Sequence, residues 1–271
     1  MTRNLAAYFD RIHYTGPVEP TLQVLHDVHR AHLLSIPYEN LDIHLGRPLT
    51  LDQDDIYDKI VARWRGGWCY EMNGLLAWAL RAIGFRLDLL GSAVGRARHG
   101  DLAEGNHLVL LVHLDQPWLA DAGFGNGLLE PVPLVESEYE QRGFVYRLSR
   151  QGEHWQFHNQ PHGGPGFDFT LAPHTMRDFA ERCHWLQTSP DSRFTRVTTC
   201  HRWRADGIHS LRGAVLQRVT PGGVEERVLE SEADYQSVLR DTFDLDLGDD
   251  VTRLWVKAWQ SHLAWLAASG A

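Results

Sequence analysis

Cys69 is the residue of this chain best placed for chemistry, because it follows the pair Gly66-Gly67 and begins an amphipathic helical pattern. A thiol in the first turn of a helix faces unpaired backbone N–H groups, which favour the thiolate. Apolar residues then recur at helical spacing as far as Gly84, which predicts the end of the helix. Cys69 lies on the same apolar stripe and is predicted to point inward. A buried cysteine without a charged partner is inert, so Cys69 alone does not decide the function.

His107 and Asp121 are the candidate partners of this thiol. His107 opens the apolar run 107–112, which is short and rich in branched residues and therefore predicts a buried strand. The turn residues 115–117 separate this run from a second predicted strand, 118–122. Asp121 is the only charge inside that second stretch, and a buried carboxylate needs a partner such as an imidazole. The hairpin places the two side chains on neighbouring strands, offset diagonally.

Each of these two residues also has a simpler explanation. His107 could be a strand-end histidine in contact with solvent, and Asp121 could cap the glycine-rich turn that follows it. Together with Cys69, however, they make up a set for nucleophilic catalysis. The imidazole takes the proton of the thiol, and the carboxylate holds the imidazole in the required tautomer and stabilises its cation. Such a triad suits acyl transfer, with the acyl group carried on sulfur.

The segment 122–127 follows Asp121 directly and carries glycines at alternating positions. Glycine lets a backbone come close to a ligand, and successive N–H groups can form an anion-binding nest. The spacing does not match a dinucleotide-binding fingerprint, and no βαβ unit precedes it. The segment is therefore either an anion-binding loop or an ordinary hairpin turn.

Several separated motifs occur in one order along nearly the whole chain. They are Tyr8–Ile12, Ile36–Asp42, Arg65–Gly74, His107–Leu108, Trp118–Gly125 and Thr188–Phe194. Together they resemble the bacterial arylamine N-acetyltransferase family. The resemblance implies an α+β fold with an N-terminal helical bundle, a central β-barrel and a C-terminal α/β lid around a cysteine-protease-like Cys-His-Asp core.

The family resemblance also implies a reaction. An acetyl group would pass from acetyl-CoA to an arylamine or arylhydrazine by a ping-pong mechanism through an acetyl-cysteine intermediate. Cys69 would be the nucleophile, His107 its base and Asp121 the residue that orients the base. Acetyl-CoA would be a co-substrate, and no metal would be needed. The partners would be coenzyme A and a small-molecule acceptor, and the protein would act in the cytoplasm as a monomer or homodimer.

Further positions match the substrate pocket of the family. Tyr38, Tyr70 and Phe124 fall where relatives line the acceptor pocket, and the two tyrosines stand where phenylalanine is common. Gly125 and Gly127 would lie near the path of the coenzyme A pyrophosphate. The hydroxyl groups of the two tyrosines would affect which acceptor is preferred and would leave the reaction mechanism unchanged.

The same resemblance assigns a structural role to three polar residues. Arg65, Glu39 and Asn40 would form a network that braces the active-site loop rather than take part in catalysis. Trp68, next to the nucleophile, stands where a smaller aromatic residue or an arginine is usual.

The chain divides into three predicted domains. Residues 1–84 are predicted to form the helical bundle that carries the nucleophile. Residues 85–190 alternate short apolar runs with turn residues, which is typical of a small barrel or a sandwich, and carry His107 and Asp121. The family resemblance implies the β-barrel. Residues 191–271 mix strands with two helices and are predicted to form the α/β lid.

Two amphipathic patterns in the first domain predict helices before the one that carries the nucleophile. Thr21 is positioned to cap the first of them. The second begins at the acidic turn 52–55 and carries Ile56, Ile60 and Trp64 on one face.

Composition limits the function classes. A length of 271 residues with 43% hydrophobic residues allows a sizeable core, and a net charge of −9 argues against binding to nucleic acid or an anionic membrane surface. The chain shows no apolar signal segment or membrane span, and three cysteines without framework spacing suit a reducing compartment. The 16 histidines do not occur in the Cys/His spacings of zinc sites.

Three alternatives remain open. The same scaffold could serve an amide synthase or a transferase of larger acyl groups. A transglutaminase-like or papain-like thiol hydrolase shares the Cys-His-Asp order. Papain-like enzymes, however, place the histidine about 130 residues or more after the cysteine, whereas His107 follows Cys69 by 38 residues. A binding protein without catalysis would carry an unreactive Cys69.

Overall fold

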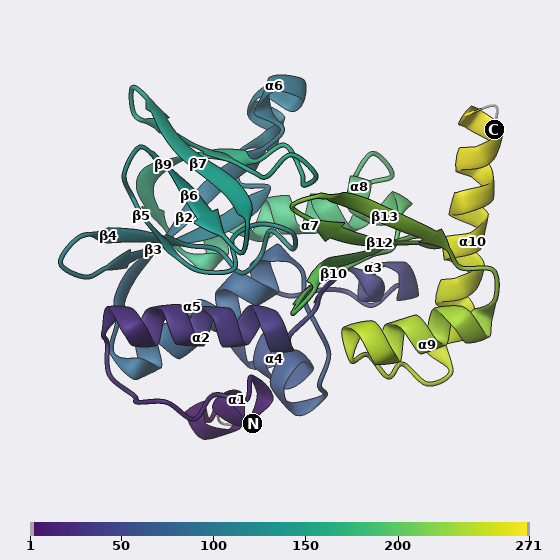
Figure 1. Ribbon diagram of the computed structural model, residues 1–271, viewed down its shortest axis with the longest axis horizontal. Coiled ribbons are helices and arrows are strands. Elements are labelled where there is room, and N and C mark those ends of the chain that lie inside the picture. Colours follow the sequence, from purple (N-terminus) through teal and green to yellow (C-terminus); the bar gives the residue numbers. More distant parts are fainter. Residues whose placement is uncertain (1–2, 270–271) are drawn as a thin grey trace.

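The N-terminal helices begin where a polar side chain caps an amphipathic stretch. In the computed structural model, which describes residues 3–269, the side chains of Asn4, Thr21 and Asp52 accept hydrogen bonds from first-turn N–H groups. This part of the molecule is the helical layer below the sheets in Figure 1. Its helices are α1 (Leu5–Arg11), α2 (Leu22–Ser35), α3 (Leu41–Leu45), α4 (Gln53–Tyr57), the π-helical η1 (Asp58–Ala62) and α5 (Cys69–Ile83).

Helix α5 has the bounds predicted from its sequence. It begins at Cys69 and ends before Gly84, whose φ of 112° is the left-handed conformation that favours glycine after a helix. Most of its side chains are buried, and it packs against β2 (Arg86–Val94) and β3 (His107–His113) as well as against α1, α2 and α4. The nucleophile candidate is therefore fixed at one end of a largely buried helix.

Two features of the N-terminal part differ from the prediction. Residues 38–39 form the short strand β1 inside a region predicted to be helical. The helix that begins at the acidic turn ends at Ala62, so the prediction that Trp64 lies on its buried face is wrong. Trp64 has a φ of 54° and is 52% exposed. Its ring packs under the Arg11 guanidinium, 4.9 Å from the ring centroid.

The central part is an antiparallel sheet that curls into the predicted barrel (Figure 1). Its strands follow the order β5-β4-β3-β2-β9-β8-β7-β6. The hydroxyl of Tyr139 on β6 donates to the carbonyl oxygen of Pro133 on β5, which brings the two edges together, although no ladder joins them in the described chain. The strands are β2 (Arg86–Val94), β3 (His107–His113), β4 (Pro117–Ala120), β5 (Val132–Pro133), β6 (Ser137–Gln141), β7 (Phe144–Gln151), β8 (His154–His158) and β9 (Phe167–His174).

Short helices connect the barrel to its neighbours. Between β2 and β3 lie α6 (Arg96–His99) and the 3₁₀ turn η2 (Gly100–Ala103). After β9 follow the 3₁₀ turn η3 (Met176–Phe179), α7 (Ala180–Thr188) and α8 (Arg193–Arg196), which lead into the second sheet.

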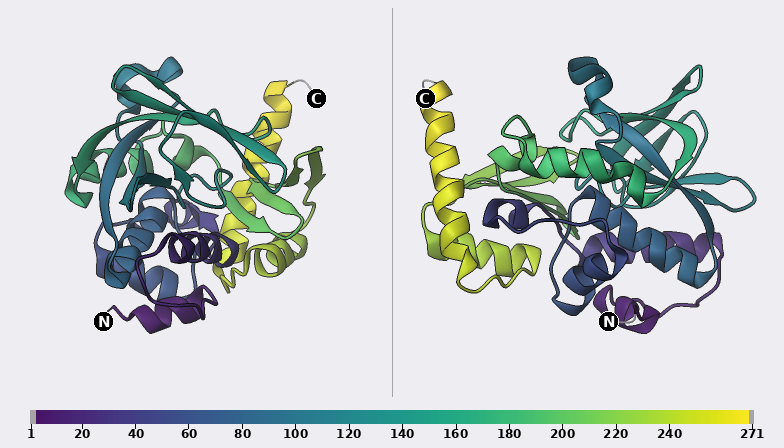
Figure 2. Two further views of the ribbon diagram at one scale, coloured as in Figure 1. Left: turned by 60° about the vertical axis from the view of Figure 1, so that its left-hand side comes forward. Right: turned by 180° about the vertical axis from the view of Figure 1, so that it is seen from behind.

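A second antiparallel sheet, with the order β1-β10-β11-β12-β13, forms the C-terminal part together with two helices. Cys200 and Leu211 on one face pack against α9 and α10, where Tyr235 and Leu254 are buried. Figure 2 shows α10 standing at the outer end of the molecule, away from the barrel. The elements are β1 (Tyr38–Glu39), β10 (Thr199–Arg204), β11 (Gly207–Arg212), β12 (Val215–Thr220), β13 (Gly223–Val228), α9 (Glu232–Phe243) and α10 (Asp250–Ser269).

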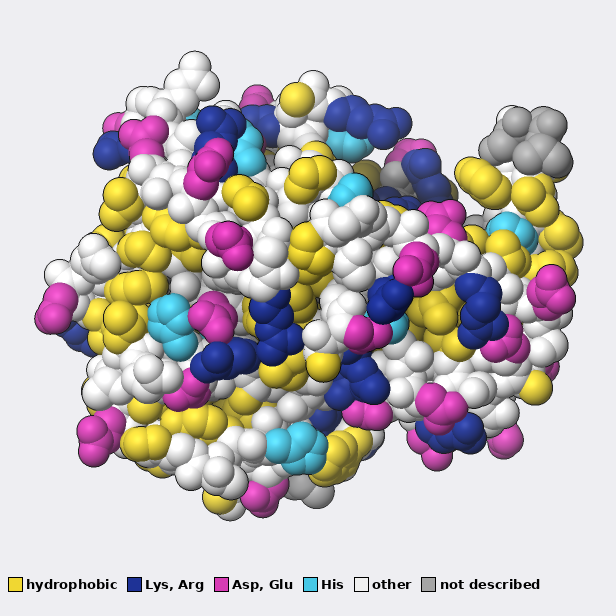
Figure 3. Space-filling view, viewed as in Figure 1, with side chains coloured by type: hydrophobic (Ala, Val, Ile, Leu, Met, Phe, Trp, Pro, Cys, Tyr) yellow, Lys and Arg dark blue, Asp and Glu magenta, His cyan; other side chains and the backbone are white. Residues whose placement is uncertain are grey.

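The observed elements agree with the predicted α+β class of helical bundle, barrel and α/β unit. The domain boundaries at residues 84 and 190 stay a prediction. None of the helices within residues 3–269 has both the length and the apolar character needed to cross a bilayer. On the face in Figure 3, basic and acidic side chains are interspersed.

Candidate active site

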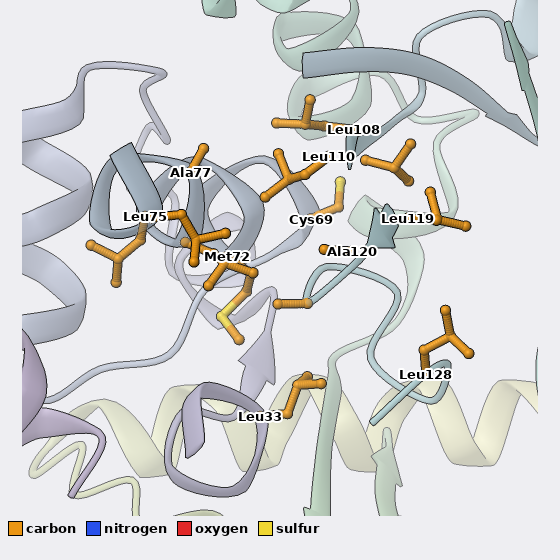
Figure 4. Packing of buried hydrophobic residues seen from close by; sticks show 14 of the residues in the cluster. Leu33, Cys69, Met72, Leu75, Ala77, Leu108, Leu110, Leu119, Ala120 and Leu128 are labelled. Atoms are coloured by element: carbon orange, nitrogen blue, oxygen red, sulfur yellow. The ribbon is translucent and has the colours of Figure 1, made fainter. Parts of the chain in front are cut away.

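Cys69 lies where α5 meets the barrel. In Figure 4 its side chain is surrounded by apolar residues, with Leu110 of β3 on one side and Leu119 of β4 on the other. Only 2% of the residue is exposed. The sulfur is 4.0 Å from the carbonyl oxygen of Asn106, the residue that precedes His107. The thiol is therefore next to the start of β3, where the candidate base is located.

His107 and Asp121 form a direct pair. The Nε2 atom of His107 lies 2.8 Å from Oδ2 of Asp121, and both side chains are buried. Since β3 and β4 pair Leu110 with Ala120, Asp121 comes opposite Val109, diagonal to His107 on the same face. This is the offset predicted for the hairpin, and burial excludes the solvent-exposed histidine. With Nε2 engaged by the carboxylate, Nδ1 is the ring nitrogen left for the thiol.

Asn73, one turn after Cys69 on α5, fastens the helix to the carboxylate. Its Nδ2 donates to Oδ1 of Asp121 at 2.8 Å, and its Oδ1 accepts from the N–H of Ala122 at 2.8 Å. Asp121 also accepts from the N–H of Gly123, so it caps the glycine-rich turn as well as binding the imidazole. A Cβ atom at Gly123 would lie 2.7 Å from the carbonyl oxygen of Cys69. The glycine loop and the helix start are thus in contact.

The electrostatics of the site correct one expectation. Burial raises the pKa of the Cys69 thiol far above its ordinary value, and the opposing effects of Arg193 and the Tyr70 N–H are smaller. The helix N-terminus therefore does not produce a thiolate by itself. Burial alone would also raise the pKa of Asp121, but His107 and further hydrogen bonds hold it below its usual range. The carboxylate is ionised, and the thiol needs a base.

His29, which the sequence analysis missed, holds the backbone of Asp121 in place. Its Nε2 accepts the N–H of Asp121 at 3.1 Å, and its Nδ1 lies 2.9 Å from the carbonyl oxygen of Leu129, to which it donates. These two contacts require the neutral imidazole. Burial lowers the pKa of His29 to about 4. Asn73 lies inside the motif Arg65–Gly74, which gave no sign of its role, whereas no motif marks His29. The position of His29 on a buried helix face is the only signal that could have pointed to it.

Two of the three residues predicted to form a structural network, Arg65 and Glu39, are in contact, and further buried charges surround them. Arg65 donates to Glu39 at 2.7 Å and lies 3.1 Å from Asp42. Lys59, which has only 4% of its side chain exposed, reaches Glu71 at 2.8 Å and Asp42 at 3.3 Å. Because all of these charges are buried, each depends on its partners.

The network is attached to the nucleophile through Glu71. Its Oε2 accepts the N–H of Trp68, which caps the helix just before Cys69. Asn40, predicted to belong to the same network, has a different position. Its Nδ2 donates to the carbonyl oxygen of Phe194 at 3.1 Å, and its Oδ1 accepts the N–H of Thr199 at 2.7 Å. Asn40 thus joins the N-terminal part to the second sheet rather than to the loop before Cys69.

A cavity of about 220 Å³ lies between the barrel and the second sheet. Its floor is one face of that sheet, where the strand register aligns Tyr38, His201, Ser210 and Gln217 across β1, β10, β11 and β12. Side chains alternate between the faces of a strand, so these residues face the cavity while their neighbours pack on α9 and α10. Phe124, after β4, forms part of the wall.

Two of the three predicted pocket residues line the cavity, and the third does not. Phe124 and Tyr38 line the cavity. The Phe124 ring lies edge-on to the ring of His107, with centroids 5.5 Å apart, and so connects the cavity to the triad. Tyr70 does not line the cavity. It is fully buried, and its hydroxyl donates to the carbonyl oxygen of Gly105 at 2.6 Å.

The two predicted coenzyme-binding glycines also lie outside the cavity lining. Gly125 has a φ of 82°, and a Cβ atom there would lie 2.6 Å from the ring of His201. The carbonyl oxygen of Gly127 accepts from the indole N–H of Trp203 at 3.2 Å. Local packing accounts for Gly125, and the contact of both glycines with coenzyme A stays a prediction. Within the described part of the chain, no three His, Cys, Asp or Glu residues are placed to hold a metal ion.

Comparisons with known proteins identify the family of the chain. A family model described as N-acetyltransferase matches residues 21–252. Arylamine N-acetyltransferase of Mycolicibacterium smegmatis is 35% identical over 92% of this chain and 94% of its own length. The pineal gland isozyme NAT-10 of Gallus gallus is 30% identical over 94% and 99%.

Solved structures give the same result. Arylamine N-acetyltransferase from Salmonella typhimurium superposes with a TM-score of 0.86 at 31% identity, covering 96% of this chain and 99% of that one. The Mycobacterium marinum enzyme in complex with CoA has a TM-score of 0.86 at 30% identity, covering 94% and 98%. With a family model, relatives and solved structures that all align along nearly its whole length, this chain belongs to the arylamine N-acetyltransferase family.

Proposed function

We propose that this protein transfers the acetyl group of acetyl-CoA to arylamines and arylhydrazines, with Cys69 as the nucleophile. One observation carries the proposal: His107 forms a buried pair with Asp121, and the Cys69 sulfur at the start of α5 lies 4.0 Å from the carbonyl oxygen of Asn106, the residue before His107. The relatives named arylamine N-acetyltransferase, and the M. marinum structure with CoA, support the choice of donor and acceptor.

In the first half-reaction, Nδ1 of His107 takes the proton of the Cys69 thiol. The thiolate attacks the thioester carbonyl of acetyl-CoA and forms a new C–S bond. The bond between the carbonyl carbon and the coenzyme sulfur breaks, and the departing thiolate takes the proton from the imidazolium. Asp121 stabilises the imidazolium while it exists and keeps the ring in one orientation.

In the second half-reaction, the nitrogen of the arylamine or hydrazine attacks the acetyl-cysteine carbonyl. His107 takes a proton from that nitrogen, the C–S bond breaks, and Cys69 leaves as the thiolate, which the imidazolium reprotonates. The product is the N-acetylated amine, and the enzyme returns to its starting state. The buried position of the thiol keeps water away from the thioester.

We assign the cavity to the acceptor. Tyr38 and Phe124 present aromatic surfaces there, and Phe124 reaches the ring of His107. We also propose that Gly125 and Gly127 lie near the bound coenzyme and that the enzyme works in the cytoplasm. The three cysteines are all free and buried, which suits a reducing compartment. Monomer and homodimer are both compatible with this scheme.

Intact-protein mass spectrometry after mixing with acetyl-CoA alone tests the first half-reaction. We expect an added mass of about 42 Da, one acetyl group held as a thioester. Cys69→Ala should give no adduct, whereas Cys183→Ala, which removes another buried thiol, should still give one. If no adduct forms and the acetyl-CoA remains intact, the proposal is rejected. Adducts of equal or greater yield from longer acyl-CoA donors would favour the broader acyltransferase, and steady hydrolysis of peptide amides would favour the thiol hydrolase.

A further inference from the structure

Two arginines line the cavity without an acidic partner. Arg193, the first residue of α8, and Arg212, the last residue of β11, both contribute to the wall. Neither guanidinium forms an ion pair with a carboxylate within residues 3–269, and no Asp or Glu belongs to the lining. The Arg193 guanidinium stacks over Phe194, 4.8 Å from the ring centroid, which leaves its N–H edge free for a ligand.

The two charges converge on the floor of the cavity. Arg212 is opposite Thr199 in the second sheet, and two residues further along these strands His201 is opposite Ser210. All four side chains are therefore on the same face of the sheet. Burial lowers the pKa of His201 to about 3, and Arg212 and Arg193 add to this effect, so both guanidiniums lie near this imidazole. His201 is neutral and adds no charge. The cavity is therefore cationic although the chain as a whole carries −9.

The cavity has an aromatic side, to which Tyr38 and Phe124 contribute, and it also carries the two guanidiniums. The charge of Arg193 is close enough to Cys69 to lower the pKa of the thiol against the effect of burial. Phe124 contacts the ring of His107 on the aromatic side. The volume of the cavity is about 220 Å³. Pockets for drug-sized ligands are larger, roughly 300–1,000 Å³. A single-ring acceptor fits these dimensions better than a fused polycyclic amine.

Building on the proposed function, we propose that Arg193 and Arg212 bind a carboxylate on the aromatic acceptor, so that amino-substituted benzoates are preferred over neutral arylamines. The amine would point toward Cys69 and the carboxylate toward the two guanidiniums. Two neighbouring guanidiniums bind a carboxylate through charge-assisted hydrogen bonds. An uncharged amide of the same shape cannot form these bonds. The phosphates of coenzyme A are the other source of negative charge for this site, and the test below separates the two.

The test compares 4-aminobenzoate with its neutral isostere 4-aminobenzamide at saturating acetyl-CoA. We expect wild type to prefer the carboxylate at least about tenfold in kcat/KM, as for a hydrogen bond to a charged group. Arg212→Gln should lower this preference about tenfold, and Arg193→Gln should lower it in the same direction. The matched control is Arg86→Gln, an exposed arginine at the start of β2, which should leave the preference and the activity unchanged.

A second arm measures the acetyl-CoA concentration needed for half-maximal acetylation of Cys69. If Arg212→Gln raises that concentration and leaves the acceptor preference intact, the arginines hold the donor phosphates and the inference is overturned. Equal losses for both acceptors, or no preference in wild type, also overturn it.

Calorimetric binding of benzoate and benzamide to wild type and Arg212→Gln gives a readout that needs no turnover. Tighter binding of benzoate that is lost in the variant supports the inference even if a variant is inactive. Absence of Cys69 acetylation in wild type is a separate result, which rejects the proposed function while this binding comparison still decides the carboxylate site.

Discussion

At the scale of single residues, Cys69 shows two physical effects in opposition. Its place at the start of α5 favours the thiolate, but its burial raises the pKa of the thiol by more. In such a buried site the thiol can ionise only if its proton passes directly to the neighbouring imidazole of His107. Asp121 makes this possible because it stays ionised next to His107.

Asp121→Asn tests this dependence. The amide can keep the hydrogen bonds of the turn but cannot stabilise the imidazolium, so kcat should fall about a thousandfold or more, as in other triads. Steady-state kinetics with an arylamine measures the loss, and circular dichroism checks that the protein is folded. Asp88→Asn is the control, since Asp88 pairs with His113 on the barrel surface at 2.7 Å and should be dispensable. Activity within tenfold of wild type for Asp121→Asn would contradict the proposed role.

At the scale of elements, the site depends on how closely the glycine loop packs against the start of α5. The loop follows β4, and its amides are held by Asp121 and Asn73. Beneath the same helix start, the charge of Lys59 is balanced by Glu71 and Asp42. The helix start is thus held on one side by hydrogen bonds to the loop and on the other by buried ion pairs.

Gly123→Ala should disturb this junction. The added Cβ would lie 2.7 Å from the carbonyl oxygen and 2.8 Å from the Cα of Cys69, so the loop or the helix start must move. A displacement of about 1 Å in a catalytic group can lower kcat about a hundredfold. Gly222→Ala is the matched control, because nothing lies closer than 3.8 Å to a Cβ atom there. Rates of Cys69 acetylation in a rapid-mixing experiment give the comparison, and equal rates for the two variants would reject this account of the loop.

The same elements show what local sequence patterns could and could not predict. The bounds of α5, the cap at Thr21 and the hairpin of His107 follow from residues close together in the chain, and these predictions agree with the structure. Strand β1 has only two residues and exists because Tyr38 pairs with His201, so no local pattern marks it.

Buried polar residues were missed for a related reason. His29, Lys59 and Asn73 occupy helix faces where a pattern of apolar residues says nothing about a polar one. Their partners come from distant parts of the chain, and only the folded arrangement reveals them. Tyr70 was assigned to the pocket from its place in a motif, yet its side chain turns to Gly105 in the interior. Motif position identifies the neighbourhood of a site but not the direction of each side chain.

At the scale of the whole molecule, buried neutral histidines tie stability to pH. Burial lowers the pKa of His29 to about 4, that of His201 to about 3, and that of His32 well below its ordinary value. In the unfolded chain these groups titrate near pH 6.5. Between the folded and unfolded pKa values the unfolded chain binds more protons, so the free energy of unfolding falls as the solution becomes more acidic.

We therefore expect the free energy of unfolding to decrease as the pH is lowered from 6.5 toward 4. His29 alone contributes about 3 kcal/mol to this decrease, because its pKa falls from 6.5 to about 4 on folding and a tenfold change in proton affinity is worth about 1.36 kcal/mol. Urea unfolding at a series of pH values measures it. The slope should be shallower in His29→Gln and unchanged in His184→Gln, an exposed control. A wild-type slope of zero across this window would contradict the assignment of neutral buried histidines.

The short strand β1 connects the cavity to the segment that leads into Cys69. Tyr38 faces the cavity, while the adjacent Glu39 is bound to Arg65, four residues before the nucleophile. One dipeptide thus joins the wall of the cavity to the buried ion pairs behind Cys69. We therefore expect a substitution that changes the shape of Tyr38 to alter both the amines that are accepted and the rate at which Cys69 is acetylated.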